Sequence, residues 1–222
     1  MIMERHIPAA RRILFLLCLL PLAYYGWELW QDNLGANPIE AFTRGLGTWA
    51  LNLLFITLTV TPLRRLTGWT WLLRLRRMLG LFVFFYACLH LTTYLWLDQF
   101  FDWSAIGKDI VKRPFITAGM IAFALLVPLA ATSNKAMIRR LGGRRWQELH
   151  RLVYPLAMIA VLHYTWMVKL DASRPAAYGA LLAVLLGMRL WWHYEELRRQ
   201  RPAAPALFPQ VKGRIIPIIP RR

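Results

Sequence analysis

Six long apolar runs, separated by short basic segments, decide what this 222-residue chain can fold into. Each run approaches the roughly 20 residues that a helix needs to cross a bilayer. In hydrocarbon, every backbone hydrogen bond has to be made within the structure, which only helices and closed barrels achieve. The sequence therefore predicts an all-α membrane protein, a six-transmembrane-helix bundle. The expected spans are Ile13–Trp30, Gly47–Leu63, Met78–Leu97, Phe115–Thr132, Leu149–Val168 and Ala176–Trp192.

The positive charge of the chain lies between these runs. The formal net charge is +17, from 28 Lys and Arg against 11 Asp and Glu. Basic residues concentrate in alternate connections: the N-terminal arm, residues 64–77, residues 135–151 and the tail from Arg189. Because Lys and Arg mark cytoplasmic loops, both termini are expected in the cytoplasm. The same placement explains the charge as a topology signal, so no nucleic-acid partner is expected.

This pattern divides the chain into three parts. Residues 1–12 are expected to form a cytoplasmic N-terminal arm, residues 13–195 the six-helix transmembrane domain, and residues 196–222 a cytoplasmic tail rich in Pro and Arg. The first apolar run lacks a small-x-small cleavage site, so it is interpreted as an uncleaved span and not as a signal peptide. Cys18 and Cys88 both fall inside apolar runs, where a packing role is expected.

Two histidines in different spans are expected at the same depth in the membrane. Imidazole is costly in hydrocarbon, so an intramembrane histidine is a functional candidate. Spans three and five run in the same direction, and the helical rise of about 1.5 Å per residue places His90 roughly 18 Å and His163 roughly 21 Å along them. Two neutral imidazoles at matched depth on neighbouring helices suit the axial ligands of one b-type heme.

Other interpretations of this pair stay open. A proton relay in a carrier, or two histidines packed for structural reasons, would also place imidazoles in the membrane. No Asp or Glu lies in the middle of a span, which disfavours a carrier. A zinc site would need three or four nitrogen, sulfur or oxygen ligands together. The alternative to a heme protein is therefore a heme-free transporter or assembly factor.

A second group of candidates lies at the cytoplasmic edge. His150 begins span five, and at that depth span three offers Arg76 and Arg77 instead of a histidine. Arginine stays protonated and is a poor iron ligand, but its guanidinium suits a heme propionate or a flavin phosphate. His150 is a candidate ligand of a second heme, with His193 as its partner, or has an electron-relay, flavin-side or structural role. Pro155 is expected to kink span five between its two histidines.

Several short stretches carry a family resemblance, which covers about residues 35–170. They are Thr59–Arg65, Arg76–Leu81, Leu89–Tyr94, Lys112–Phe115, Thr132–Ser133 and Trp146–Trp166. In this order they resemble the ferric-reductase-like transmembrane family, most closely its heme-binding membrane subunits of bacterial periplasmic methionine-sulfoxide reductase systems. In related NADPH oxidases, spans three and five carry two histidines each and hold two stacked hemes. Here span three keeps only His90, which favours one well-defined heme and leaves the inner one open.

The resemblance also implies a function. It implies a multi-pass protein of the bacterial cell inner membrane that binds heme b and FMN. Electrons are expected to arrive from the quinone pool or a cytosolic flavin reductase. They are expected to pass to a periplasmic molybdopterin-containing methionine-sulfoxide reductase catalytic subunit, for repair of oxidised periplasmic proteins. The chain would then be the redox subunit, without catalytic residues of its own. The alternative is a heme-containing ferric reductase-like protein with another acceptor.

Overall fold

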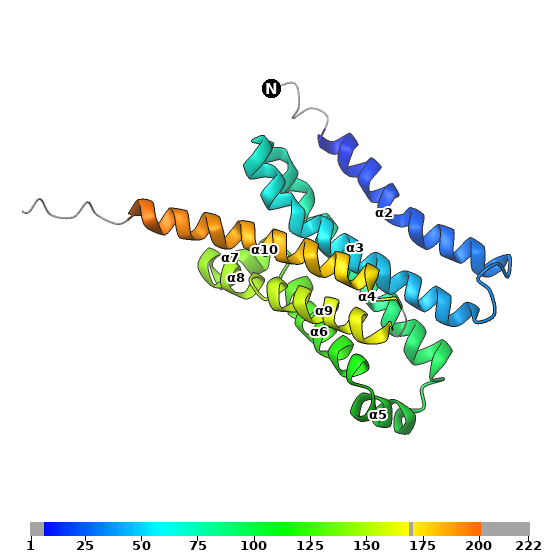
Figure 1. The fold of residues 1–222 in the computed structure, drawn as a ribbon. Coiled ribbons are helices and arrows are strands. Elements are labelled where there is room, and N and C mark those ends of the chain that lie inside the picture. Colours follow the sequence, from blue (N-terminus) through cyan, green and yellow to red (C-terminus); the bar gives the residue numbers. More distant parts are fainter. Residues whose placement is uncertain (1–6, 169–170, 201–222) are drawn as a thin grey trace, which may run out of the picture.

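The computed structural model describes residues 7–168 and 171–200 as a helical bundle (Figure 1), and within these ranges it contains no strand. The all-α prediction is therefore confirmed for the part of the chain that the structure describes. Most of the expected N-terminal arm, residues 1–6, and most of the expected tail, residues 201–222, lie outside the described residues.

Five helical segments in the described ranges are long and apolar enough to cross a membrane. They are α2 (Ile7–Trp30), α3 (Pro38–Thr67), the continuous stretch of η1, α4 and η2 (Thr70–Asp98), α6 (Pro114–Ala131) and α10 (Ser173–Gln200). Within that stretch, α4 spans Leu73–Thr93 and η2 is a π-helical turn over Tyr94–Asp98. A multi-pass membrane protein is therefore the architecture that these helices support.

The fifth apolar run does not form one continuous helix, in contrast to the prediction. Helix α8 (Gly143–His150) ends at His150, and α9 (Val153–Met167) begins after a turn at residues 151–152. Helix α9 has 15 residues, fewer than the roughly 20 that span a bilayer. Pro155 lies in the first turn of α9. Backbone N–H groups there have no intrahelical partner, so the missing N–H of proline costs this helix no hydrogen bond. The break lies between the two histidines, as expected from Pro155, which has no N–H for the Arg151 carbonyl; that carbonyl accepts from the N–H of Tyr154 instead, at 3.0 Å.

Three short helices form the connections. Helix α5 (Trp103–Lys112) is capped by the Asp102 carboxylate, which accepts bonds from two backbone N–H groups of its first turn. Helix α7 (Lys135–Leu141) is capped in the same way by Asn134. Figure 1 places α5 at one end of the bundle and α7 with α8 at the other. We call these the α5 end and the basic end, because residues 64–77 and 135–151 lie at the second one.

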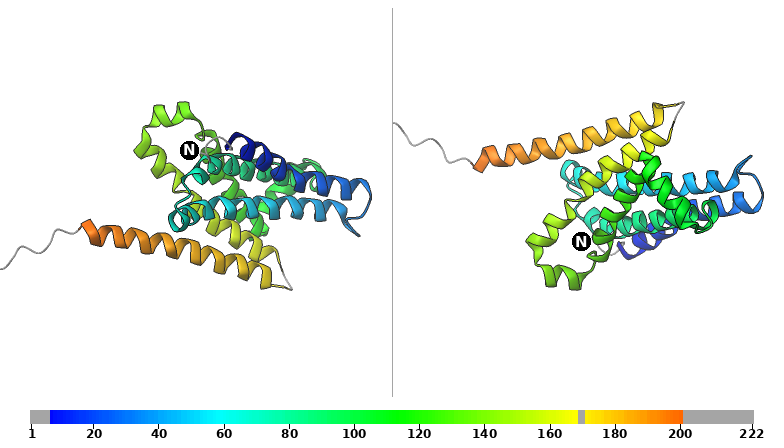
Figure 2. Two further views of the ribbon diagram at one scale, coloured as in Figure 1. Left: turned by 90° about the horizontal axis from the view of Figure 1, so that it is seen from above. Right: turned by 90° about the horizontal axis from the view of Figure 1, so that it is seen from below.

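The helices pack as two antiparallel pairs, α3 with α4 and α6 with α9. Helix α10 lies along α9 and α3, and its C-terminal half projects past the bundle in both views of Figure 2. Both α3 and α6 begin at the α5 end, where α4 and α9 finish. Helices α4 and α9 therefore run in the same direction, as the depth argument requires.

Helix α2 is fastened to α4 through Tyr86, whose side chain is fully buried. The Tyr86 hydroxyl donates to the carbonyl of Cys18 (2.7 Å) and accepts from the N–H of Leu22 (3.1 Å). In a regular helix these two backbone groups would bond to each other. Pro21 lies between them, and an inserted side chain is a recognised partner of such a kink. The hydroxyl thus satisfies backbone groups that lipid could not.

Candidate functional site: a histidine pair between two helix pairs

The two helix pairs enclose a cavity of about 740 Å³, within the range of roughly 300–1,000 Å³ typical of ligand sites. It runs from the α5 end, where Asn37 and Met167 line it, to Leu54, Leu126 and Leu156 in the middle of the bundle. We call it the histidine pocket and its part at the α5 end the mouth. Because its inner wall is apolar, the pocket suits a large, flat, mostly apolar group.

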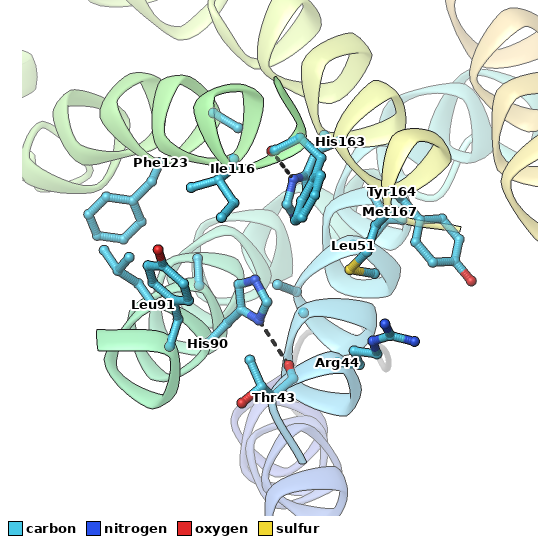
Figure 3. Close-up of a pocket in the computed structure, with 18 of the residues that line it drawn as sticks. Thr43, Arg44, Leu51, His90, Leu91, Ile116, Phe123, His163, Tyr164 and Met167 are labelled. Atoms are coloured by element: carbon cyan, nitrogen blue, oxygen red, sulfur yellow. Dashed lines mark hydrogen bonds between the residues drawn. The ribbon is translucent and has the colours of Figure 1, made fainter. Parts of the chain in front are cut away.

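His90 and His163 face each other inside this pocket. Figure 3 shows His90 reaching in from α4 and His163 from α9, with their rings approaching across the space between the helices. The two ring centroids are 6.2 Å apart and the ring planes make an angle of 72°. The fold thus brings together the two imidazoles that the sequence placed at the same depth.

Each imidazole is held by a backbone carbonyl of the partner helix in its pair. His90 Nδ1 bonds the Thr43 carbonyl on α3 at 2.8 Å, and His163 Nδ1 bonds the Phe115 carbonyl on α6 at 2.6 Å. A carbonyl only accepts, so Nδ1 carries the hydrogen in both rings. The neutral ring then has its lone pair on Nε2, the atom left for a metal. Metal-binding histidines are typically oriented in this way by their second nitrogen.

A glycine lies behind each imidazole, four residues after the carbonyl that holds it. A Cβ on Gly47 would lie 3.0 Å from Cε1 and Nδ1 of His90. A Cβ on Gly119 would lie 3.0 Å from Cε1 and 3.1 Å from Nδ1 of His163. Such distances are below ordinary van der Waals contact, so any side chain here would push the ring. The two helix pairs therefore contribute the same arrangement of carbonyl, glycine and histidine.

These distances fit a heme iron between the rings. A metal–imidazole bond of roughly 2 Å on each side, with each ring centre about 1 Å behind its nitrogen, puts the centroids about 6 Å apart. In the described part of the chain, no group of three or more His, Cys, Asp or Glu side chains forms a metal site. A porphyrin supplies four further nitrogens to its iron, so two protein ligands suffice.

His150 occupies a separate position, at the end of α8 and outside the histidine pocket. Its Nδ1 donates to the Trp146 carbonyl (3.0 Å), and its Nε2 lies 3.4 Å from the Ser133 hydroxyl. The Trp146 ring stacks on the imidazole with centroids 3.9 Å apart. Burial lowers the pKa of His150, which lies outside the candidate spans, and nearby Arg76 lowers this pKa further, while the bond to Trp146 opposes the shift. Burial therefore favours the neutral imidazole.

The other candidates from the sequence also lie away from the pocket. Arg76 is half-buried, and its Nη1 lies 3.5 Å from the Thr61 hydroxyl. Arg77 and His193 are exposed. Neither Arg76 nor Arg77 lines the histidine pocket. These two arginines therefore belong to the basic end and not to the site of the histidine pair.

Sequence reasoning found the histidines but missed the residues that hold them. Thr43 and Phe115 act through their backbone carbonyls, so their side chains give no signal. Gly47 and Gly119 repeat the same spacing to the preceding carbonyl, but a glycine in an apolar helix has many other causes. One signal was detectable. In both helix pairs, a glycine lies four positions after the residue whose carbonyl holds the ring, and the histidine lies on the next long helix.

Comparisons with known proteins place the chain among heme-binding membrane proteins. The family described as "Ferric reductase like transmembrane component" matches residues 45–161. The chain is 61% identical over 187 residues to the protein-methionine-sulfoxide reductase heme-binding subunit MsrQ of Azospira oryzae, which covers 84% of this chain and 80% of the relative. Relatives of the same name from Rhodospirillum rubrum (59% identical; 81% and 86% covered) and Herminiimonas arsenicoxydans (53%; 87% and 90%) are also similar.

Proposed function

This chain belongs to the ferric reductase like transmembrane family, among its MsrQ heme-binding subunits, and on that premise we propose that its electron-transfer group is a heme b held by His90 and His163. The observation that carries the proposal is the pair of imidazoles 6.2 Å apart, each with Nδ1 bonded to a backbone carbonyl. The heme iron supplies a one-electron carrier between the two ends of the bundle.

The protein's contribution is to keep the iron ligands in place. The carbonyls of Thr43 and Phe115 fix the tautomer and the orientation of the rings, so both Nε2 atoms stay directed into the pocket. The rings rest against helices α3 and α6 because Gly47 and Gly119 carry no side chain. The heme iron would then be six-coordinate in both its oxidised and its reduced state, and the protein would move little between the two. This favours fast electron transfer over binding of an external ligand.

We propose a direction of electron flow from the different character of the two ends of the molecule. We propose six spans, with α9 as the fifth, both termini in the cytoplasm and the α5 end in the periplasm of an inner membrane. Electrons would enter at the basic end from the quinone pool or a cytosolic flavin reductase. They would leave at the α5 end to a periplasmic molybdopterin-containing methionine-sulfoxide reductase catalytic subunit. The names of the relatives support a role with a methionine-sulfoxide reductase.

The basic end is where we propose an FMN or a second heme to bind. Arg76 and Arg77 offer guanidinium groups to a flavin phosphate, and the positive surface around them attracts anions. His150 Nε2 lies 3.4 Å from the Ser133 hydroxyl, and we propose that His150 serves as a ligand of a second heme or as a flavin-side residue. The support for FMN is the family resemblance. No contact described in this region identifies a flavin site.

Optical spectroscopy tests the heme assignment. Protein purified from heme-replete cells should show a Soret band that shifts on dithionite reduction. Substituting His90→Ala or His163→Ala should abolish the six-coordinate, low-spin spectrum of this heme and lower its occupancy, because only one imidazole is left to bind the iron. Cys88→Ala, two residues before His90 on α4 but not among the residues that line the pocket, is the matched control and should keep this spectrum. Full heme occupancy in both pocket variants would reject the assignment.

A kinetic measurement separates the proposed acceptor from another one. The reduced protein is mixed with the periplasmic catalytic subunit or with ferric citrate, and reoxidation of the heme is followed optically. Faster reoxidation by the catalytic subunit supports the proposed pathway. Reoxidation by ferric citrate alone would identify a ferric reductase instead.

A further inference from the structure

We propose that Arg44 and Arg113 bind the two propionate carboxylates of the heme, so that the charged edge of the porphyrin faces the mouth of the histidine pocket. This inference rests on the proposed heme at His90 and His163 and adds its orientation. The ligand chemistry is a pair of carboxylates on one edge of a flat apolar group.

The positions of the two arginines carry the first step. Arg44 directly follows Thr43, whose carbonyl holds His90, and Arg113 lies two residues before Phe115, whose carbonyl holds His163. Both arginines line the same pocket as the two imidazoles. One guanidinium therefore comes from each side of the pocket, from the same turn that orients the imidazole on that side. Figure 3 shows Arg44 near the Thr43 end of the pocket.

The polarity of the lining carries the second step. Among the described residues, charged side chains line the pocket only at its mouth, and the inner wall is made of aliphatic and aromatic side chains. The charged residues are Glu40, Arg44, Asp98 and Arg113, and the inner wall includes Leu54, Val83, Ala87, Phe123, Leu126 and Leu156. A heme has the same asymmetry, with two carboxylates on one edge and apolar substituents on the others. Because burying a charge in an apolar wall is costly, only one orientation matches.

The ion pairs of the two arginines are the third observation. Each is held by a carboxylate one helical turn earlier: Arg44 pairs with Glu40, and Arg113 Nε lies 3.2 Å from Asp109. Both pairs are partly exposed, so they orient the guanidinium groups without saturating them. The planar guanidinium has five donors in a geometry that matches a carboxylate. A propionate would therefore add to these pairs and need not replace them.

An unsatisfied hydroxyl carries the last step. Thr43 lines the pocket, and its buried Oγ1 has no hydrogen-bond partner in the part of the chain that the structure describes. Buried polar atoms in proteins nearly always have a partner, so this one calls for an acceptor or donor at the mouth. A propionate oxygen beside Arg44 is such an acceptor. Asp98 also lines the mouth, but its carboxylate is not the partner of the Thr43 hydroxyl. It accepts from the side-chain amide of Gln99, at 2.9 Å.

Reconstitution with a modified heme tests the proposal. The full-length protein, produced without heme, is titrated with protoheme or with its dimethyl ester, in which both carboxylates are blocked. The wild type should bind protoheme at least tenfold more tightly than the ester. The double variant Arg44→Gln/Arg113→Gln should lose most of this preference, while both tetrapyrroles still give a six-coordinate spectrum. Arg199→Gln is the matched control, because Arg199 also pairs with a carboxylate one turn earlier, Glu195, but lies near the end of α10 and outside the pocket.

Redox potentiometry gives an independent readout on the same variants. A cation beside the heme stabilises the reduced form, so removing both arginines should lower the midpoint potential. A tenfold change in the reduction equilibrium corresponds to about 59 mV for one electron. Equal binding of heme and ester by the wild type, or an unchanged preference in the double variant, would overturn the propionate proposal and leave the iron ligands untouched. If the wild type forms no six-coordinate spectrum with either tetrapyrrole, the proposed function fails as well.

Discussion

At the scale of single residues, Gly47 and Gly119 determine how closely the imidazoles approach α3 and α6. The carbonyls of Thr43 and Phe115 can hold Nδ1 only if the Nδ1 edge of each ring lies close to its neighbouring helix. A methyl group on either glycine would enter the space of the ring, at about 3.0 Å from its atoms. Residue type and depth were enough to find the histidines, but this support depends on packing that the sequence does not display.

A methyl group at these positions should therefore weaken heme binding. We expect Gly47→Ala and Gly119→Ala to lower the heme content several-fold, because the ring must shift away from its carbonyl and out of line with the iron. A pyridine hemochrome assay gives heme per polypeptide. Gly80→Ala is the control, since a Cβ at Gly80 meets no atom within 4 Å and alanine favours the helix. Wild-type heme content in both pocket variants would show that the glycines do not position the rings.

At the scale of helices, the fifth apolar run is where sequence and structure differ most. Hydropathy predicted one span over Leu149–Val168, whereas the structure has a turn after His150 and a 15-residue α9. At about 1.5 Å per residue α9 is roughly 22 Å long, shorter than a hydrocarbon core of about 30 Å. Apolar composition does not show where a backbone turns, but Pro155 indicated a break between the two histidines, and the turn at residues 151–152 lies just before it. Its consequence is that His150 and His163 do not share one helix.

Whether α9 crosses the membrane decides the topology, and thiol labelling measures it. In a background without Cys18 and Cys88, Ser173→Cys and Arg139→Cys place one thiol on each side of α9, both at exposed positions. We expect an impermeant maleimide added to intact spheroplasts to label Ser173→Cys. Arg139→Cys should be labelled only after the membrane is opened. Labelling of both thiols from the same side would mean five spans and termini on opposite sides.

At the scale of the whole molecule, two helix hairpins of the same design enclose one pocket between a basic end and a mouth. The common direction of α4 and α9 and the meeting of His90 and His163 were predicted from hydropathy, charge placement and helical rise, whereas the structure has five and not six candidate spans in the described residues. The connecting helices α5, α7 and α8 did not, because short capped helices depend on local residues such as Asp102 and Asn134. The pocket mouth was also missed, since Arg44 and Arg113 reach it only through the packing of α3 and α6.

The most direct test of the central claim is an electron paramagnetic resonance spectrum of the oxidised wild-type protein in membranes. Two imidazoles on one iron give low-spin ferric heme, and ring planes at 72° predict the strongly anisotropic signal of nearly perpendicular axial ligands. We expect this signal in the wild type, with an intensity that corresponds to one heme for the His90 and His163 pair. It should be absent in His90→Ala and His163→Ala. A heme that is high-spin in the wild type, or a low-spin signal that survives both substitutions, would contradict the account.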